Sequence, residues 1–199
     1  DADFTPESDD LPWCMVPERK ITVEDVKYVL SSYYQGTEYN PYARHGDPSR
    51  RGMYRPIGIN RNNFVAITQL RPYMPRELMG IEWIAVASNA FNAAAPFYAN
   101  VETTPAYLAA TDGKVTTDSF YWASRLVAAL ADAHYPECIA HVERYQLKLP
   151  TQAHALLKKF DQAYVAHPAK NAQAYLADCN QQLADLTRAL TDELLSNVL

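Results

Sequence analysis

The stretch FVAITQLRPYMPRELMGIEWIAVASNAFNAAAPFYANV, residues 64–101, contains the parts of this sequence that predict a β-sheet. Three runs within it, at 64–71, 81–88 and 96–101, are six to eight residues long and rich in Val, Ile, Phe, Tyr or Trp. Pro, Gly or Asn bounds each run, as is typical of strands. The stretch therefore predicts three strands.

A sheet of three strands is small, and its two faces and two edges need cover. The run IEWIAVA is apolar on both sides, which is typical of a strand buried between two layers. A partner for the sheet is thus expected outside these strands. The chain also opens at Asp1, without an initiator Met, in a Pro- and Asp-rich segment. We therefore expect a part of a longer protein that lacks its N-terminal portion.

Upstream of the sheet, ITVEDVKYVLSSYYQG (21–36) predicts a helix over 22–35. Thr22 is followed three residues later by Asp25, the spacing of a capping box, and Gly36 is a natural C-terminal stop. Residues 37–62 hold three prolines and three glycines, so they predict a long irregular loop. Loops of this length are usually functional.

Downstream of the sheet the pattern turns helical. The segment TDSFYWASRLVAALADAHY (117–135) has one apolar face, with Thr117 or Asp118 as its N-cap. Further helices are expected at 136–147, at 150–166 and from near Pro168 to the C-terminus.

The last of these helices carries an apolar stripe formed by Leu176, Cys179, Leu183, Leu186, Leu190 and Leu194. The stripe is close to a coiled-coil seam, but about three heptads with Thr and Asp flanks favour packing within the same domain. The sequence thus predicts an α+β fold. Residues 1–116 form its sheet-containing part, and residues 117–199 form a helical region packed on it.

Composition excludes several classes of protein. The net charge of −5 and pI near 5.5 disfavour nucleic-acid binding, because phosphates require a basic surface. No run approaches the roughly 18–20 apolar residues of a membrane span, and DADFTPESDD lacks the features of a signal peptide. Three widely separated cysteines, Cys14, Cys138 and Cys179, predict reduced thiols. We expect a cytoplasmic protein with no nucleic-acid or membrane partner.

Four segments carry a family resemblance: RKITVEDVKYVLSSYYQGTEYNPY, YRPIGINRN, ITQLRPYMPRELMGIEWIAVASNAFNAAAPFYANVETTP and DSFYWASRLVAAL. They resemble the C-terminal portion of bacterial dipeptidases of the dipeptidase A type, peptidase family C69, a branch of the N-terminal-nucleophile (Ntn) hydrolases. The resemblance covers most of residues 13–130 and is weaker over the helical tail. It implies a four-layer αββα fold, of which this chain supplies one part, and a dipeptide substrate.

The same resemblance implies a nucleophile that this chain does not contain. In the family a cysteine exposed as the first residue attacks the peptide carbonyl, and its own α-amino group serves as the base. The first residue here is Asp1, and all three cysteines are internal. The chain is therefore expected to be a fragment of a cysteine-type dipeptidase that is inactive alone.

Basic residues gather in the loop before the first strand: Arg44, Arg50, Arg51, Arg55 and Arg61. One interpretation is a solvated basic loop. The other follows from substrate chemistry, because a guanidinium can bind the free carboxylate of a dipeptide with two hydrogen bonds. The candidate substrate-binding residues, at the two ends of the first strand, are Arg55, Asn60, Arg61 and Arg71.

Similarity also indicates a catalytic candidate. Related Ntn amidases place an arginine just before a helix, beside the nucleophile, where its charge lowers the thiol pKa. Arg19, just before the first predicted helix, matches best, with Arg55 or Arg71 as alternatives. Asn89 and Asn92 are candidates to donate amide hydrogen bonds to substrate or to an oxyanion, or are turn residues between two strands.

A metal site is not expected. His134, Cys138 and His141 fall near one helical face, but Pro136 interrupts that helix and a fourth ligand is not evident. Catalytic Ser-His-Asp, HExxH, P-loop and dinucleotide-binding motifs do not occur. No cofactor is implied.

Two function classes follow. The first is the C-terminal part of a dipeptidase, whose helical tail serves packing or subunit contacts in a homo-oligomer. The second is a non-catalytic binding or assembly module that retained the fold and lost the nucleophile.

Overall fold

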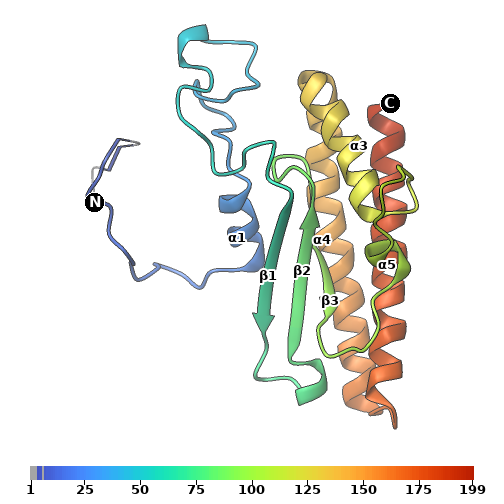
Figure 1. Ribbon diagram of the computed structural model, residues 1–199. Coiled ribbons are helices and arrows are strands. Elements are labelled where there is room, and N and C mark those ends of the chain that lie inside the picture. The colour runs from blue at the N-terminus through green and yellow to red at the C-terminus, as the bar shows by residue number, and fades with distance from the viewer. Residues whose placement is uncertain (1–3, 6) are drawn as a thin grey trace.

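The computed structural model describes residues 4, 5 and 7–199, which form an α+β fold (Figure 1). A small antiparallel sheet lies against long helices of the C-terminal region, so the α+β part of the expected fold class is confirmed. The strands are β1 (Phe64–Leu70), β2 (Gly80–Val86) and β3 (Ala95–Tyr98). The α-helices are α1 (Val23–Leu30), α2 (Ala106–Ala109), α3 (Phe120–Ala133), α4 (Tyr135–Ala166) and α5 (Ala172–Val198).

The sheet has the order β1-β2-β3, with both pairs antiparallel. Trp83 of the central strand lies opposite Ile67 on one side and Pro96 on the other. The strand ends lie within three residues of the ranges that composition predicts. Local sequence was sufficient here because each run is β-branched or aromatic and ends at a turn residue.

The two edges of the sheet are treated differently. At β3, the backbone N–H of Tyr98 donates to Asn180 Oδ1 (2.8 Å), and Asn180 Nδ2 donates to the Tyr98 carbonyl (3.0 Å). A side chain of α5 thus satisfies this edge. At β1, no second strand pairs with the outer side within residues 4, 5 and 7–199, and Phe64 and Leu70 are 56% and 70% exposed. The expected unpaired edge is therefore β1.

The faces of β1 and β2 also differ. Val65, Trp83 and Ala85 are buried on one face, where the Trp83 ring contacts His154 of α4 (ring centroids 4.8 Å apart). On the other face Thr68 is exposed and donates to Glu82 (2.8 Å). The expectation that β2 is buried on both sides is only partly met, because its residues alternate between buried and half-buried.

The helical region has fewer breaks between helices than the sequence predicts. Residues 135–166 form one helix of 32 residues, not two, with Pro150 inside it. An internal proline removes one helical hydrogen bond at a cost of about 3 kcal/mol. Buried residues on both sides of it, including Leu149 and Ala153, pack into the core and hold the helix together. Pro136 lies in the first turn, where its missing N–H is not needed.

The N-terminal ends of the other two long helices also differ from expectation. Helix α3 is preceded by Ser119, not by Thr117 or Asp118, and Ser119 makes no side-chain cap hydrogen bond. Helix α5 begins after Asn171, whose Oδ1 accepts from the Ala174 N–H (3.1 Å). That cap places the helix start four residues after Pro168.

The apolar stripe of α5 packs within this chain. Leu176, Cys179, Leu183, Leu190 and Leu194 are buried, and α5 contacts α3, α4 and β3. They belong to one apolar cluster that includes Trp83 and the buried face of the sheet. The helical region and the sheet therefore share a core. None of the helices in the described part of the chain is long and apolar enough to cross a membrane.

Helix α1 begins as the sequence predicts and ends earlier. Thr22 and Asp25 form a reciprocal capping box. The helix stops at Leu30, five residues before the expected end, and Tyr34 then adopts a left-handed conformation (φ 60°). This turn lets the buried Tyr33 pack against Tyr42 and Tyr135, so tertiary packing overrides the helical pattern.

The loop between α1 and β1 returns to the end of that helix. The Gly58 N–H donates to the Ser32 carbonyl (2.7 Å), and a Cβ at residue 58 would lie 2.2 Å from the Ser31 carbonyl oxygen. Only glycine fits this approach. The loop contains one short 3₁₀ turn, Pro48–Arg50, and is otherwise irregular, as its composition predicts.

Candidate functional site

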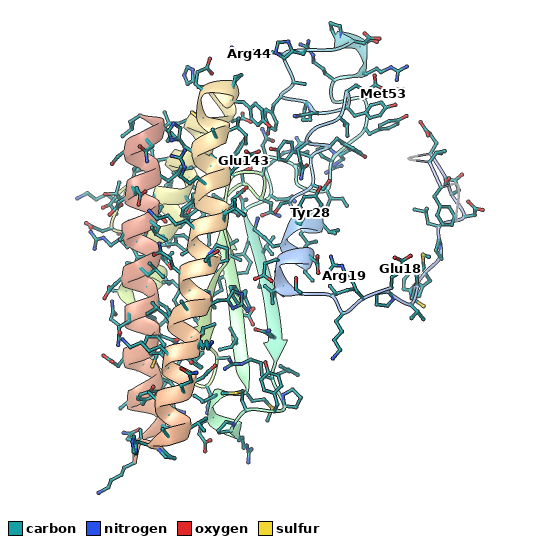
Figure 2. The ribbon with its side chains drawn as sticks, turned by 180° about the vertical axis from the view of Figure 1, so that it is seen from behind. Glu18, Arg19, Tyr28, Arg44, Met53 and Glu143 are labelled. Carbon is teal, nitrogen blue, oxygen red and sulfur yellow. The ribbon has the colours of Figure 1, made fainter. Side chains whose placement is uncertain are left out.

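A groove of about 800 Å³ lies between α1 and α4, with Trp83 of β2 at its floor. In Figure 2, Tyr28 on α1 and Glu143 on α4 mark the two helices that border it. The polar lining side chains come from α1, the segment after it, the turn after β2 and α4: Glu24, Lys27, Ser31, Tyr33, Gln35, Asn92, Glu143, Gln146, Thr151 and His154. Its volume is in the usual range for ligand sites, roughly 300–1,000 Å³.

One contact joins the two walls of the groove. His154 Nε2 on α4 pairs with Glu24 Oε1 on α1 at 2.7 Å. Burial raises the pKa of Glu24, but the interaction with His154 and the hydrogen bonds from backbone and from Thr22 together outweigh it, so the net pKa is lowered. Glu24 is therefore ionised at neutral pH and fixes the α1 end of the groove against α4.

Lys27 lies deeper in the same groove. Its Nζ donates to Ser31 Oγ (2.5 Å) and to the carbonyl of Asn89 (3.2 Å). Both partners are uncharged, and burial lowers the pKa of Lys27 to about 7. This amine thus loses its proton at a much lower pH than an ordinary lysine does.

The turn after β2 forms the end of the groove. Ala87 has a left-handed conformation (φ 65°), and its N–H donates to the Asn63 carbonyl (2.8 Å). Gln146 Nε2 of α4 donates to the carbonyls of Ala90 and Asn92 (2.9 and 3.1 Å), which holds the turn against the helix. The turn is therefore fixed from both sides.

Asn92, a sequence candidate, lines this groove. Its Nδ2 donates to the carbonyls of Val86 and Ala87 (3.0 and 3.1 Å), while its buried Oδ1 has no hydrogen-bond partner among the described residues. The amide hydrogens of Asn92 thus hold the turn in place. Asn89 donates weakly to the Leu30 carbonyl (3.4 Å) and links the turn to the end of α1.

Arg19 lies outside the groove, on the segment that leads into α1 (Figure 2). Its side chain is 71% exposed and makes a two-pronged pair with Asp25 (2.6 and 2.8 Å). The hydrogen bonds from Arg19 and from Thr22 hold the pKa of Asp25 well below its usual range. In this structure Arg19 therefore supports the α1 cap.

The candidates around the loop are spread over the surface. Arg55 and Arg61 are exposed, and neither forms an ion pair within the described residues. Asn60 Nδ2 donates to Asp132 of α3 (3.0 Å). Arg44 pairs with Glu137 at the start of α4 (3.2 Å), so part of the basic loop is tied to the helices. The structure does not bring these residues to the groove.

Arg71, the remaining candidate, is buried and held by several polar contacts. Its guanidinium pairs with Asp161 of α4 (2.6 and 3.2 Å) and donates to the Leu78 carbonyl (2.6 Å). Tyr98 donates to the same carboxylate (2.8 Å). These contacts tie β1 and β3 to α4, and they are those of a structural ion pair.

The cysteines and histidines do not form a reactive or metal-binding centre. Burial raises the pKa of Cys138 and of Cys179, the latter to about 11, and Cys14 is an exposed free thiol. No group of three or more His, Cys, Asp or Glu side chains in the described part of the chain is arranged to hold a metal ion.

Sequence reasoning missed Lys27, Glu143 and His154, because the groove joins residues more than a hundred positions apart. One signal was present in the sequence. Lys27 falls one helical turn after Val23 and one before Ser31, on the side of α1 that faces the groove. A lysine on the inward face of a helix is unusual, since ammonium groups are rarely buried without a partner.

Comparison with known proteins places these residues in a family. Residues 1–148 match the model of peptidase family C69. A dipeptidase of Bifidobacterium longum (strain NCC 2705) is 51% identical over 81% of this chain and 30% of its own length. A probable dipeptidase A of Streptococcus pyogenes serotype M18 is 43% identical over 98% of the chain and 40% of its own length. Dipeptidase A of Lactobacillus helveticus is 35% identical over 100% of the chain and 42% of its own length.

Proposed function

Because this chain belongs to peptidase family C69, we propose that it forms the C-terminal part of a dipeptidase, an enzyme that hydrolyses dipeptides. The observation that carries the proposal is the match of residues 1–148 to the family, with relatives named as dipeptidases. The chain spans 30% to 42% of the length of the relatives described above. The rest of the catalytic machinery is proposed to lie in the remaining portion of the enzyme.

The proposed whole fold is the αββα sandwich of the Ntn hydrolases. Its support is the open side of the sheet, where β1 has an unpaired edge and the face carrying Phe64, Thr68 and Leu70 is exposed. Further strands and a second sheet would cover both. In this proposal residues 1–116 contribute to the α/β core, and residues 117–199 form the helical region that packs on it. The exposed side of that region is the candidate for subunit contacts in a homo-oligomer.

The proposed nucleophile is a cysteine at a processed N-terminus, outside the residues of this chain. Cys138 and Cys179 support this assignment indirectly, because burial and a raised pKa keep their thiols protonated and unreactive. Free thiols also suit the cytoplasm, which we propose as the location of the enzyme.

Within this proposal Arg19 remains the candidate to lie beside the nucleophile. In the longer protein, Arg19→Ala is expected to lower kcat far more than it raises KM, because the charge acts on the reacting thiolate. Arg55, Asn60 and Arg61 remain candidates for substrate binding at the loop. Asn92 is the sequence candidate that the groove contains, and Arg71 is committed to Asp161.

The test uses a panel of dipeptides with two proteins. The 199-residue chain is expected to show no hydrolysis from pH 5 to 9. The longer protein that carries these residues at its C-terminus is expected to hydrolyse several of the dipeptides. Replacement of Cys14, Cys138 or Cys179 by Ala in that protein should leave kcat nearly unchanged. If the longer protein hydrolyses none, the chain is a non-catalytic binding or assembly module; if the short chain turns over through an internal cysteine, the nucleophile assignment is wrong.

A further inference from the structure

We propose that the Lys27 amine binds the free α-carboxylate of a dipeptide in the groove between α1 and α4, and so makes the site specific for peptides with a free C-terminus. The inference rests on the proposed dipeptidase function and names a residue that sets its substrate class. The arginines near the first strand are then not required for that task.

The hydrogen-bond partners of the Lys27 amine are uncharged. Ser31 and the Asn89 carbonyl are neutral acceptors, and within the described residues Lys27 forms no ion pair with a carboxylate. A half-buried ammonium with only neutral partners gains most from an anion that enters the groove. A carboxylate is the anion that every free dipeptide carries.

The groove around Lys27 combines apolar walls with charged side chains. Its walls are largely apolar, with Val23, Trp83 and Leu147 suited to the side chains of a peptide. Glu143, exposed on α4, supplies a negative charge at the rim, again without an ion-pair partner among the described residues. One positive and one negative group in a single apolar groove are complementary to a zwitterion. An uncharged segment of protein would leave both charges without partners.

Lys27 shares the groove with other titratable side chains. They are Glu24, Tyr28 and Tyr33 from α1 and the segment after it, and Glu143 and His154 from α4. Glu24 is already paired with His154, and Tyr33 is hydrogen-bonded to Tyr135 (3.0 Å), so neither serves Lys27. The Lys27 amine is therefore the cation available to a ligand.

The test measures binding of Ala-Leu and of its C-terminal amide to the 199-residue chain by calorimetry at pH 6. The wild-type chain is expected to bind Ala-Leu about tenfold to hundredfold more tightly than the amide, the usual effect of one charge-assisted hydrogen bond. Equal affinity for both peptides, or no binding of either, would overturn the inference.

Three variants separate charge from structure. Lys27→Met and Lys27→Gln should both abolish the preference for the free acid, although Gln retains a hydrogen-bond donor. A purely structural role would be rescued by Gln. Lys20→Met removes an equal charge outside the groove and should keep the preference. Persistence of the preference in both Lys27 variants would refute the role of the amine.

Failure of the inference can be told from failure of the proposed function. If the longer protein hydrolyses Ala-Leu and Lys27→Met leaves its ratio of kcat/KM for free and amidated dipeptides unchanged, only the inference fails. If the 199-residue chain binds with the expected preference but the longer protein hydrolyses no dipeptide, only the proposed function fails.

Discussion

Two cationic residues, the buried Arg71 and the half-buried Lys27, have opposite surroundings in this molecule. Arg71 is paired with Asp161, and its guanidinium also reaches the Leu78 carbonyl. Lys27 has Ser31 and a backbone carbonyl as partners, and it lines a groove of about 800 Å³. Both side chains can carry a positive charge, but among the described residues only Arg71 has a carboxylate partner.

The difference separates a structural charge from one that is available to a ligand. A guanidinium with a two-pronged carboxylate partner gains little from a second anion. An amine with neutral partners has an electrostatic cost that an incoming carboxylate removes. The network around Arg71 thus links β1 to α4, and the Lys27 groove is the better candidate for substrate. The predictions below test this distinction.

The largest loss of stability is expected when the ion pair between Arg71 and Asp161 is broken. Arg71→Met leaves the largely buried Asp161 carboxylate without its partner, and such a change costs about 3–5 kcal/mol. Urea denaturation of the 199-residue chain measures it. The double variant Arg71→Met with Asp161→Leu should recover part of the loss, because no isolated charge is left in the core. A loss below about 1 kcal/mol in the single variant would contradict the structural assignment.

A smaller loss of stability is expected when the Tyr98 hydroxyl, which also donates to Asp161, is removed. Tyr98→Phe removes the donor to Asp161 and keeps the ring in the core, so the free energy of unfolding should fall by about 1.5–3 kcal/mol. Tyr175→Phe is a matched control, because its hydroxyl donates to a backbone carbonyl and should cost less, about 0.5–1.5 kcal/mol. Equal losses in the two variants would show that the charge of Asp161 contributes nothing through Tyr98.

At Lys27 the contribution of the amine to the free energy of unfolding is expected to depend on pH. Its folded-state pKa of about 7 lies below the unfolded value of about 10.4, so the unfolded chain binds the extra proton between these two values. This amine therefore contributes a stability that rises with pH through that window. Lys27→Met should remove the rise, an effect on the order of 1–2 kcal/mol after allowance for partial exposure. Urea denaturation of the wild-type chain and of the Lys27→Met variant at pH 6.5, 8 and 9.5 measures this difference. If the free energy of unfolding changes with pH in parallel in the two proteins, Lys27 behaves as an ordinary lysine.

The smallest effect on stability is expected at Arg19. Its pair with Asp25 is exposed, so Arg19→Ala should shift the urea midpoint less than any change above. Asp25→Ala should shift it more, because that change also removes the capping box with Thr22. If the Arg19 variant loses as much stability as the Asp25 variant, the ion pair and not the cap stabilises the start of α1.

The sequence predicted the elements whose causes are local. The three β-branched and aromatic runs became β1, β2 and β3, and the Thr22–Asp25 spacing formed the expected cap. The prediction from sequence failed where residues far apart in the chain determine the structure. Pro150 stays inside α4 because both flanks of that helix are buried, and α1 ends early because Tyr33 packs with Tyr135.

The candidate site shows the same limit. Arg71 was a reasonable candidate for binding a carboxylate, but its partner Asp161 lies 90 residues away and is a side chain of this chain. The groove around Lys27 exists only because α1 packs beside α4, so its residues carried no shared motif. Asn92, chosen from the turn after β2, does line the groove, because a turn between two adjacent strands is a local feature.

The central claim is that the Lys27 amine, which has no carboxylate partner among the described residues, binds the carboxylate of a dipeptide. The most direct test is to measure the pKa of this amine by NMR. In the 199-residue chain without ligand, titration is expected to give a value near 7. With saturating Ala-Leu the value should rise, because the bound carboxylate stabilises the charged form, while the amide of Ala-Leu should leave it unchanged. An ordinary lysine value in the free chain, or one that responds equally to both peptides, would contradict the account.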